Sequence, residues 1–349
     1  MKRALCALTA FIIIFVLTSC GIQTVIPGDA ATDYRASSNI TSGAARVAAA
    51  DGKIYVSSGS GGIYVIDPDK DHPAGYDIES DVFKAGEYGD ICFFGGMIYA
   101  LRSGSGGLDE IVAIDPGTGA EKLVKAFSEA EKGSVWFSDL IGDVLYVWVN
   151  GSINSLDASG TFRDTGLRDT LMITGKGSYV RAYEKDGFSM GLVYVPDDRK
   201  GAGTVEYAEL KDRRVSVYFR YGGRVYIAAD NRPAFIEAEG KSTKVTYING
   251  FDGIPGLNEA LFVGLNYTDT PESGLVCSVV GSNDGSASEE YPYLASVYSV
   301  DPSSGKTEEI FRKPLRFVPL CWISVIGDEI FASGIGDTTE WIPSGGNAE

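Results

Sequence analysis

One pattern repeats along most of this 349-residue chain, and it constrains the fold more than any other feature. A short apolar segment with an aromatic or β-branched centre is followed by a glycine-rich turn, a second apolar segment and an acidic residue. Two copies match closely, at 52–68 and 96–116. The centre of the first segment recurs in six steps that average 46 residues, at Tyr55, Tyr99, Tyr146, Tyr179, Tyr226, Val276 and Phe331. The acidic residue recurs at Asp67, Asp115, Asp157, Asp197, Glu237 and Asp301. Both markers indicate about seven units.

Each unit also shows signals for two flanking strands. In the second unit, residues 90–94 precede a Gly-Gly turn, and residues 121–127 follow the turn that starts at Asp115. Hairpin turn dipeptides lie where a four-stranded meander needs them, at Asp51-Gly52, Gly95-Gly96, Asn150-Gly151 and Gly222-Gly223. Repeated units of four short strands are typical of a β-propeller. We therefore predict an all-β fold, a β-propeller of about seven four-stranded blades, with six or eight blades as the alternative.

Some parts of the repeat are incomplete or could form another structure. The last unit supplies only three strands, so a strand within 33–47 is the candidate that completes it and closes the ring. Two β-sandwich domains are the opposing architecture, but they would need a linker near the middle, where the composition does not change. Residues 120–132 are rich in Ala, Glu and Lys and could form a short helix in place of an outer strand.

The N-terminus carries the signals of an exported chain. Lys2 and Arg3 precede an apolar stretch over 4–17, which is too short for a permanent membrane helix of roughly 20 residues. The segment Leu17-Thr18-Ser19-Cys20 resembles the lipobox of bacterial lipoproteins, in which the cysteine becomes the lipidated first residue of the mature chain. An ordinary secretory signal with an incidental cysteine is the alternative.

The lipobox resemblance implies a domain organisation and an address. We expect a signal peptide at 1–19, a lipidated tether at 20–43 and a single propeller domain at 44–349. The acyl chains on Cys20 would anchor the protein to the outer membrane or cell surface, facing the periplasm or the exterior.

The repeats resemble a propeller family as well. An Ile-Tyr-Val strand followed by an Ile-Asp-Pro ending, as at 63–68 and 111–116, looks like the repeats of bacterial YVTN- and PQQ-like propellers. This resemblance implies a fold, and proteins that share it include scaffolding envelope lipoproteins, surface binding proteins and a few enzymes. PQQ-dependent dehydrogenases often bring an adjacent cysteine pair, which this chain lacks, so we predict no such cofactor.

Composition excludes several function classes. The formal charge of −17 argues against nucleic acid as a partner, because binding phosphates needs a basic surface. A single histidine argues against most zinc sites and most histidine-based acid–base chemistry. Cys92, Cys277 and Cys321 each lie in an apolar run, which predicts buried free thiols, although one disulfide remains open in an exported protein.

Two motifs suggest chemistry. Asp67, Asp69 and Asp71 have the spacing that starts a calcium loop, yet His72 stands where such a loop requires glycine. Calcium is therefore the one metal we consider, with solvated turn carboxylates as the alternative. The segment 187–191 fits the G-x-S-x-G pattern of hydrolases, but strand-forming residues follow it and the histidine lies upstream, so we predict a hairpin instead of a catalytic triad.

The long loops of the sixth unit are the main candidates for function. One of them, 282–293, combines aromatic with acidic residues, a composition suited to a protein partner. We name as candidate binding residues Asp284, Glu289, Glu290, Tyr291 and Tyr293. Solvated connections are the alternative.

These observations favour a non-catalytic, lipid-anchored β-propeller, a monomer that acts as a binding or scaffolding module for a protein or glycan in the bacterial cell envelope. A propeller hydrolase or lyase with a carboxylate metal site in the central channel is the alternative.

Overall fold

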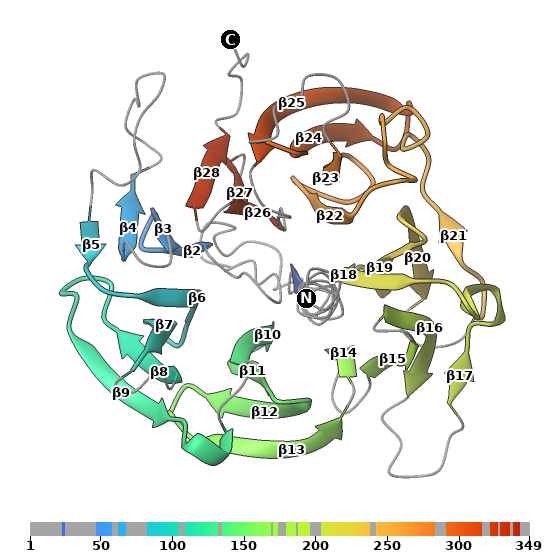
Figure 1. Cartoon of the computed structure of the whole chain (residues 1–349). Helices are drawn as coiled ribbons and strands as arrows, with labels where there is room; N and C mark the ends of the chain where they lie inside the picture. The colour runs from blue at the N-terminus through green and yellow to red at the C-terminus, as the bar shows by residue number, and fades with distance from the viewer. Residues whose placement is uncertain are drawn as a thin grey trace, which may run out of the picture. The chain divides into compact units, whose positions relative to one another are not determined.

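The computed structural model describes residues 23–24, 47–57, 62–67, 82–104, 109–131, 135–168, 170–173, 179–185, 188–195, 204–237, 242–282, 291–315, 322–326, 329–335 and 338–342. In this part of the chain the regular structure is strand, apart from two three-residue 3₁₀ helices. The predicted all-β fold is therefore confirmed (Figure 1). The chain divides into two compact units, Gln23–Arg168 with Trp322–Glu349, and Asp169–Cys321 with Met1–Ile22, and each is described by itself.

The first unit holds four antiparallel sheets whose strands follow chain order. The first sheet consists of β2 (Val47–Ala50), β3 (Lys53–Ser57), β4 (Ile63–Ile66) and β5 (Val82–Lys84). The second consists of β6 (Tyr88–Phe94), β7 (Met97–Ser103), β8 (Asp109–Ile114) and β9 (Glu121–Ala126). The third consists of β10 (Val135–Ile141), β11 (Val144–Val149), β12 (Ser152–Asp157) and β13 (Phe162–Arg168). The C-terminal sheet consists of β26 (Trp322–Ile326), β27 (Glu329–Ile335) and β28 (Thr338–Ile342). A two-residue strand, β1, covers Gln23–Thr24.

The second unit holds three sheets of the same pattern. The first consists of β14 (Thr170–Ile173), β15 (Tyr179–Lys185), β16 (Phe188–Val195) and β17 (Val205–Glu206). The next consists of β18 (Val215–Tyr221), β19 (Arg224–Ala229), β20 (Arg232–Glu237) and β21 (Thr246–Tyr247). The last consists of β22 (Phe262–Tyr267), β23 (Leu275–Ser282), β24 (Tyr293–Asp301) and β25 (Lys306–Leu315).

These sheets are the blades of a β-propeller. Among the described residues, six of them have the four consecutive strands of a complete blade, the number that the sequence left as an alternative, and the C-terminal sheet has three strands. All seven marker residues spaced along the sequence, from Tyr55 to Phe331, fall in the second strand of a sheet. Of the segment 33–47 that was predicted to complete the C-terminal sheet, residues 33–46 lie outside the described residues, and Val47 begins β2 in the first sheet.

The hairpin turns follow the predicted dipeptides. Asp51 and Gly52 both have positive φ, 51° and 73°, which is the type I′ geometry that matches the twist of two adjacent strands. Both central residues have positive φ in the other predicted turns too, at Gly95-Gly96, Asn150-Gly151 and Gly222-Gly223. At Gly95 a Cβ would also come within 2.8 Å of the Cβ of Ala158, so no other residue fits there without a shift.

The repeated acidic residue has a structural role where the third strand turns into the fourth. The Oδ1 atom of Asp115 accepts backbone N–H groups from Gly117 (2.9 Å) and Thr118 (2.8 Å). Asp301 does the same for Ser303 (2.8 Å) and also accepts the Ser303 hydroxyl (2.6 Å). These hydrogen bonds hold the pKa of both carboxyls below the usual range. The acidic marker therefore shapes a turn, as an Asx turn does.

The core lies between neighbouring sheets. In the first unit, Phe331 of the C-terminal sheet is fully buried in a cluster with Val47, Ile54 and Val56 of the first sheet. The two ends of the described chain therefore pack together by side-chain contact. A polar contact also joins two neighbouring sheets. The carboxylate of the buried Asp90 on β6 accepts the backbone N–H of Phe137 on β10 at 2.8 Å.

The second unit is built in the same way. Tyr218 on β18 donates its hydroxyl to the Val263 carbonyl on β22 at 2.8 Å. Aromatic rings continue the contact, since Phe219 lies 4.8 Å from Tyr267 between ring centroids and 4.5 Å from Tyr226.

Strand pairing also decides between a short helix and an outer strand in 120–132. Residues Glu121–Ala126 form the outer strand β9, and only Glu129–Glu131 form a single 3₁₀ turn. Because β9 pairs along β8, the strand interpretation of this segment is confirmed and the helical one is wrong beyond that turn.

Candidate functional site

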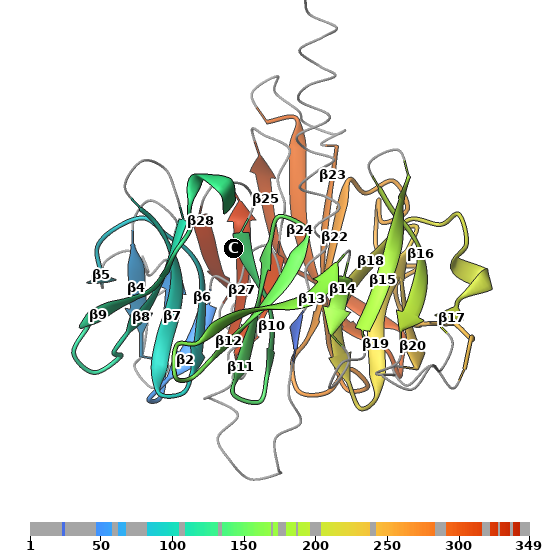
Figure 2. The same cartoon turned by 90° about the horizontal axis from the view of Figure 1, so that it is seen from below.

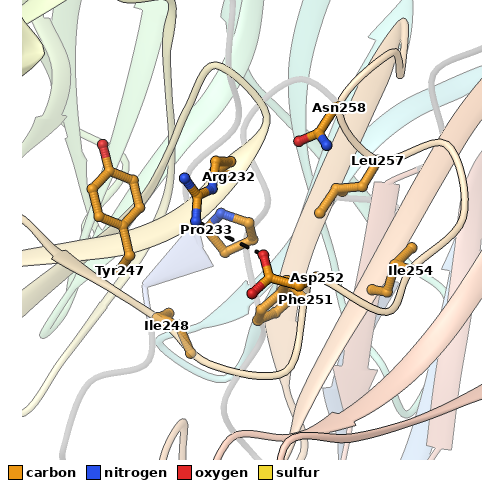
Figure 3. Close-up of a pocket in the computed structure, with 9 residues that line it drawn as sticks. All are labelled: Arg232, Pro233, Tyr247, Ile248, Phe251, Asp252, Ile254, Leu257 and Asn258. Carbon is orange, nitrogen blue, oxygen red and sulfur yellow. Dashed lines mark ion pairs between the residues drawn. The ribbon is translucent and has the colours of Figure 1, made fainter.

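A small cleft lies in the second unit, between the outer part of its middle sheet and the connection to β22. Its volume is about 60 Å³, which is far below the several hundred Å³ of a pocket for a drug-sized ligand. Nine residues line it: Arg232, Pro233, Tyr247, Ile248, Phe251, Asp252, Ile254, Leu257 and Asn258 (Figure 3). A site of this size can take one small group of a ligand.

Strand pairing sets one wall of the cleft. Arg232 and Pro233 begin β20 directly after the tight turn at Asp230 and Asn231, where both residues have positive φ. The outer strand β21 pairs Tyr247 with Ala234, and the Ile248 N–H donates to the Pro233 carbonyl at 3.0 Å. The proline accepts this bond through its carbonyl but has no N–H to donate, and it lies next to the start of β20, where a strand tolerates proline.

The connection to β22 forms the other wall. Backbone hydrogen bonds close turns from Ile254 N–H to Phe251 (3.1 Å) and from Ala260 N–H to Leu257 (3.3 Å). The Asn231 side chain donates to the Ala260 carbonyl at 2.8 Å, which ties the connection to the β19–β20 turn. The cleft is therefore formed by backbone that is held at both ends.

Polar groups make up most of the surface that lines the cleft, and its mouth is charged. Phe251, Ile254 and Leu257 are each 4–5% exposed. At the mouth, the Arg232 guanidinium lies over the Tyr247 ring, 5.1 Å from its centroid. Figure 3 shows Asp252 pointing toward Arg232, and the Nη2 and Oδ1 atoms are 3.8 Å apart.

That ion pair is loose. A distance of 3.8 Å exceeds hydrogen-bond length, and the Asp252 side chain is 94% exposed. Among the described residues, the guanidinium of Arg232 has no hydrogen-bond acceptor, and its side chain is 52% exposed at the cleft mouth. An exposed pair of this kind contributes little to stability.

Sequence reasoning missed this cleft. The signal that could have found it is the connection over 248–261, which joins β21 to β22 and is long for a propeller loop. Its glycines and proline are typical of an ordinary turn region. No charge pattern in the sequence distinguishes Arg232, because Arg232 and Asp252 come close only in the folded protein.

The predicted binding loop follows β23 and precedes β24. Tyr293 begins β24 and pairs with Ser282 of β23 and Leu315 of β25, and both Tyr291 and Tyr293 are half-buried. The other three candidates, Asp284, Glu289 and Glu290, lie outside the described residues. Figure 2 shows this sheet, whose β23, β24 and β25 are 8, 9 and 10 residues long.

The outer strand of the same sheet, β25, carries charged side chains. Glu309 accepts both the Tyr298 hydroxyl (3.0 Å) and the Arg312 guanidinium (2.9 Å). Burial, followed by the bond to Glu309, raises the pKa of Tyr298, so its hydroxyl stays protonated as a donor. The exposed Pro314 lies on the same outer strand and cannot donate a hydrogen bond to an added strand.

The calcium prediction involves the first sheet. Asp67 follows β4 directly, at the position that Asp115 occupies after β8, while Asp69 and Asp71 lie outside the described residues. Within the described ranges, no group of three or more Asp, Glu, His or Cys side chains could hold a metal ion. The metal site remains a prediction.

Other sequence predictions can be placed. The G-x-S-x-G segment lies on an antiparallel hairpin, where Ser189 of β16 pairs with Glu184 of β15, so the predicted hairpin is confirmed. Cys92 and Cys277 are buried thiols, as expected, and form no disulfide in the described part of the chain, whereas Cys321 lies outside the described residues.

The membrane-related predictions concern the N-terminus. Cys20, like the rest of the predicted signal segment, lies outside the described residues. Of the helices in the described part of the chain, none has the length and apolarity needed to cross a bilayer.

Comparisons with known proteins concern the fold. No protein-family model matches the chain, and no curated protein matches it. An oligogalacturonate lyase from Vibrio parahaemolyticus is 8% identical with a TM-score of 0.45, covering 85% of each chain. An oligogalacturonate lyase in complex with manganese is 13% identical with a TM-score of 0.39, covering 69% of this chain and 68% of that one.

An uncharacterized protein from Listeria monocytogenes is 8% identical with a TM-score of 0.43, covering 90% of this chain and 94% of that one. Similarities at this level of identity say nothing of activity, substrate or partner.

Proposed function

We propose that this chain is a lipid-anchored β-propeller of the bacterial envelope that binds a protein or glycan partner without catalysing a reaction. The observation that carries the binding role is the long hairpin formed by β23 and β24. It ends in half-buried tyrosines on two strands whose central side chains are buried. Rigid sheets that present a long loop are a common architecture for binding.

The membrane address rests on the N-terminal sequence. The run from Leu17 to Cys20 follows an apolar segment of export-signal length. Two or more acyl chains on one cysteine hold a protein durably on a bilayer, while a single chain does not. The propeller would then face the periplasm or the exterior as a monomer on a tether.

Fractionation of the full chain tests the anchor. Wild-type protein should partition with membranes, and a Cys20→Ala variant should lose this partitioning because no acyl chain can be attached. Cys6→Ala is the matched control, since it lies in the same signal segment outside the lipobox. A Cys20→Ala protein that still fractionates with membranes would refute the anchor.

Site-specific crosslinking tests the binding role. A photoreactive phenylalanine analogue at position 293 should capture a partner from cells that express the chain. The same analogue at Val82, which is 54% exposed on β5 in the other unit, is the control. Equal capture at both positions, or none at 293, would contradict a binding role for the hairpin.

The catalytic alternative, a hydrolase or lyase with a carboxylate metal site, rests on Asp67, Asp69 and Asp71. It predicts that Ca²⁺ or Mg²⁺ raises the melting temperature and that Asp69→Asn with Asp71→Asn removes this shift. No metal response would leave the binding module as the better account.

A further inference from the structure

We propose that the end of the long β23–β24 hairpin binds an aromatic side chain from an acidic segment of a protein partner, and that the ring lies over Gly281. This partner chemistry rests on the proposed binding role of the hairpin and names the kind of protein that it binds. The strand residues that form the surface are Gly281, Leu294 and Pro314.

The described part of the chain does not explain a glycine at position 281. Its φ is not in the left-handed region, so the backbone there can carry an L side chain. Apart from its chain neighbours, no heavy atom of the described residues lies within 4 Å of the position that a Cβ would take. Gly52 and Gly151 have the same open space, but both have the positive φ of a turn. A strand glycine loses much conformational entropy on folding and packs nothing, so it often marks a place where another molecule approaches closely.

The length of the hairpin explains the open space over Gly281. In the neighbouring sheet of the same unit, β19 ends at Ala229, three residues after the repeated Tyr226. β23 ends at Ser282, six residues after the corresponding Val276. Gly281 therefore lies in a part of β23 that has no counterpart in β19.

Apolar residues border this position. Strand pairing places Leu294 of β24 opposite Gly281 and Pro314 of β25 opposite Leu294, so the three form one row on the same face of the sheet. Leu294 is half-buried and Pro314 is exposed. Just before β22, Leu261 donates its N–H to the Val280 carbonyl at 2.8 Å, and it is 38% exposed. The surface thus offers apolar contacts around a centre that has no side chain.

An aromatic ring suits a gap of this kind. In β-sheets an aromatic side chain on a neighbouring strand compensates for a glycine by covering it. The neighbour of Gly281 on β24 is Leu294, so the fold does not supply such a ring from that strand. The side chains of Leu294 and Pro314 have no hydrogen-bonding group for the hydroxyls of a glycan, which favours a protein side chain. Aromatic residues are also the usual anchors of protein interfaces.

The charges beside the row favour an acidic partner segment. Arg312 lies on the same face as Pro314, two residues earlier on β25, and its side chain is 55% exposed. It donates to Glu309 at 2.9 Å, and Lys313 follows it directly. In a chain with a formal charge of −17, two adjacent basic residues are a local exception. Charges at the rim of an interface mainly guide association with a partner of opposite charge.

Methyl NMR of the purified full chain with a small aromatic probe tests the surface. In leucine-methyl-labelled protein, the Leu294 signals are identified by their loss in Leu294→Ile. N-acetyl-tryptophanamide should shift them upfield in a saturable way, because a ring over Gly281 shields the adjacent methyl groups, and N-acetyl-leucinamide is the matched control probe. Gly281→Leu should weaken binding of the aromatic probe by roughly tenfold or more, since it fills the space. Glu308→Leu, near the other end of β25, is the control variant and should bind as the wild type does.

The melting temperature of the same variant tests whether the fold needs this glycine. Gly281→Leu should unfold at the wild-type temperature or above it, because leucine loses less backbone entropy than glycine in a strand. A lower melting temperature, or a variant that does not fold, would show that the glycine serves the fold and would overturn the proposal. So would the absence of a saturable shift with N-acetyl-tryptophanamide, or equal binding of N-acetyl-leucinamide.

Crosslinking from position 293 separates this proposal from the proposed function. Where the wild type captures a partner, Gly281→Leu should reduce capture by roughly tenfold or more, and added salt should reduce it as well. Undiminished capture by Gly281→Leu would overturn the aromatic contact and leave the binding role of the hairpin intact. Capture that does not depend on salt, or a captured glycan, would overturn the acidic protein partner. No capture by the wild type would contradict the proposed function, while the probe titration would still decide the surface at Gly281.

Discussion

Replacing Phe331 by alanine tests whether the first and last sheets of the chain depend on each other for stability. Phe331 lies on β27 in the C-terminal sheet and has no exposed surface. Its neighbours Val47, Ala49 and Val56 come from the first sheet, nearly 300 residues away in sequence. We expect the free energy of unfolding to fall by about 4 kcal/mol, within the usual cost of removing a buried phenylalanine.

The expected loss of stability is large because the surrounding side chains can move little to fill the cavity that alanine leaves at position 331. The side chains around it belong to paired strands, and two of them, Val47 and Val56, are already fully buried at 0% exposure. Phe331→Leu leaves most of the volume filled and should cost about 1.5 kcal/mol. Leu123→Ala, on a residue that is 50% exposed on β9, should cost well under 1 kcal/mol.

Urea unfolding monitored by tryptophan fluorescence measures these differences through the midpoint and the slope of the transition. A loss in Phe331→Ala no larger than the loss in Leu123→Ala would refute the packing of the two terminal sheets. A loss near 4 kcal/mol together with an intermediate value for the leucine variant would support it.

Three further predictions concern buried and ionisable groups. Asp90→Ala should cost about 2 kcal/mol, because the buried N–H of Phe137 loses its acceptor, whereas Asp90→Asn should cost less; denaturation of both variants measures this. Burial raises the pKa of Tyr207 to about 12, so the stability it contributes is full below pH 10 and is lost as the pH rises toward 12. Tyr207→Phe should flatten the fall in unfolding free energy over that range, and an unchanged pH profile would contradict the assignment. The Arg168 guanidinium lowers the pKa of Asp164 to about 2, so the contribution of this pair is present above about pH 4 and is lost as the pH falls through 2. Carboxyl ¹³C NMR should show this pKa move up toward 3.8 in Arg168→Ala, and a pKa that stays near 2 would exclude Arg168 as the cause.

Much of the fold could be predicted because its signals are local. The Asp51-Gly52 turn needs positive φ at two adjacent residues, and few residue pairs supply that without strain. Short apolar runs mark the inner strands, and the repeated acidic residue accepts N–H groups only a few residues away, as at Asp115. Such interactions are encoded within a short stretch of sequence and recur with each blade.

The candidate sites were less predictable because they depend on contacts between distant segments. The loop with Tyr291 and Tyr293 stood out by its composition, so the sequence identified it as a candidate. Nothing in the composition connects Arg232 with Phe251, because the two residues meet only when β21 pairs with β20 and the following connection folds back.

The sequence by itself therefore determined the all-β class, the repeat and the positions of its turns, since each depends on neighbouring residues. Only the tertiary structure decided how the described strands group into sheets, with four consecutive strands in six of them and three in the last, that Phe331 packs against the first sheet, and that Arg232 and Asp252 meet at the mouth of a small cleft. The physical reason is that burial and the pairing of outer strands depend on residues far apart in the chain, and these come together only in the folded protein.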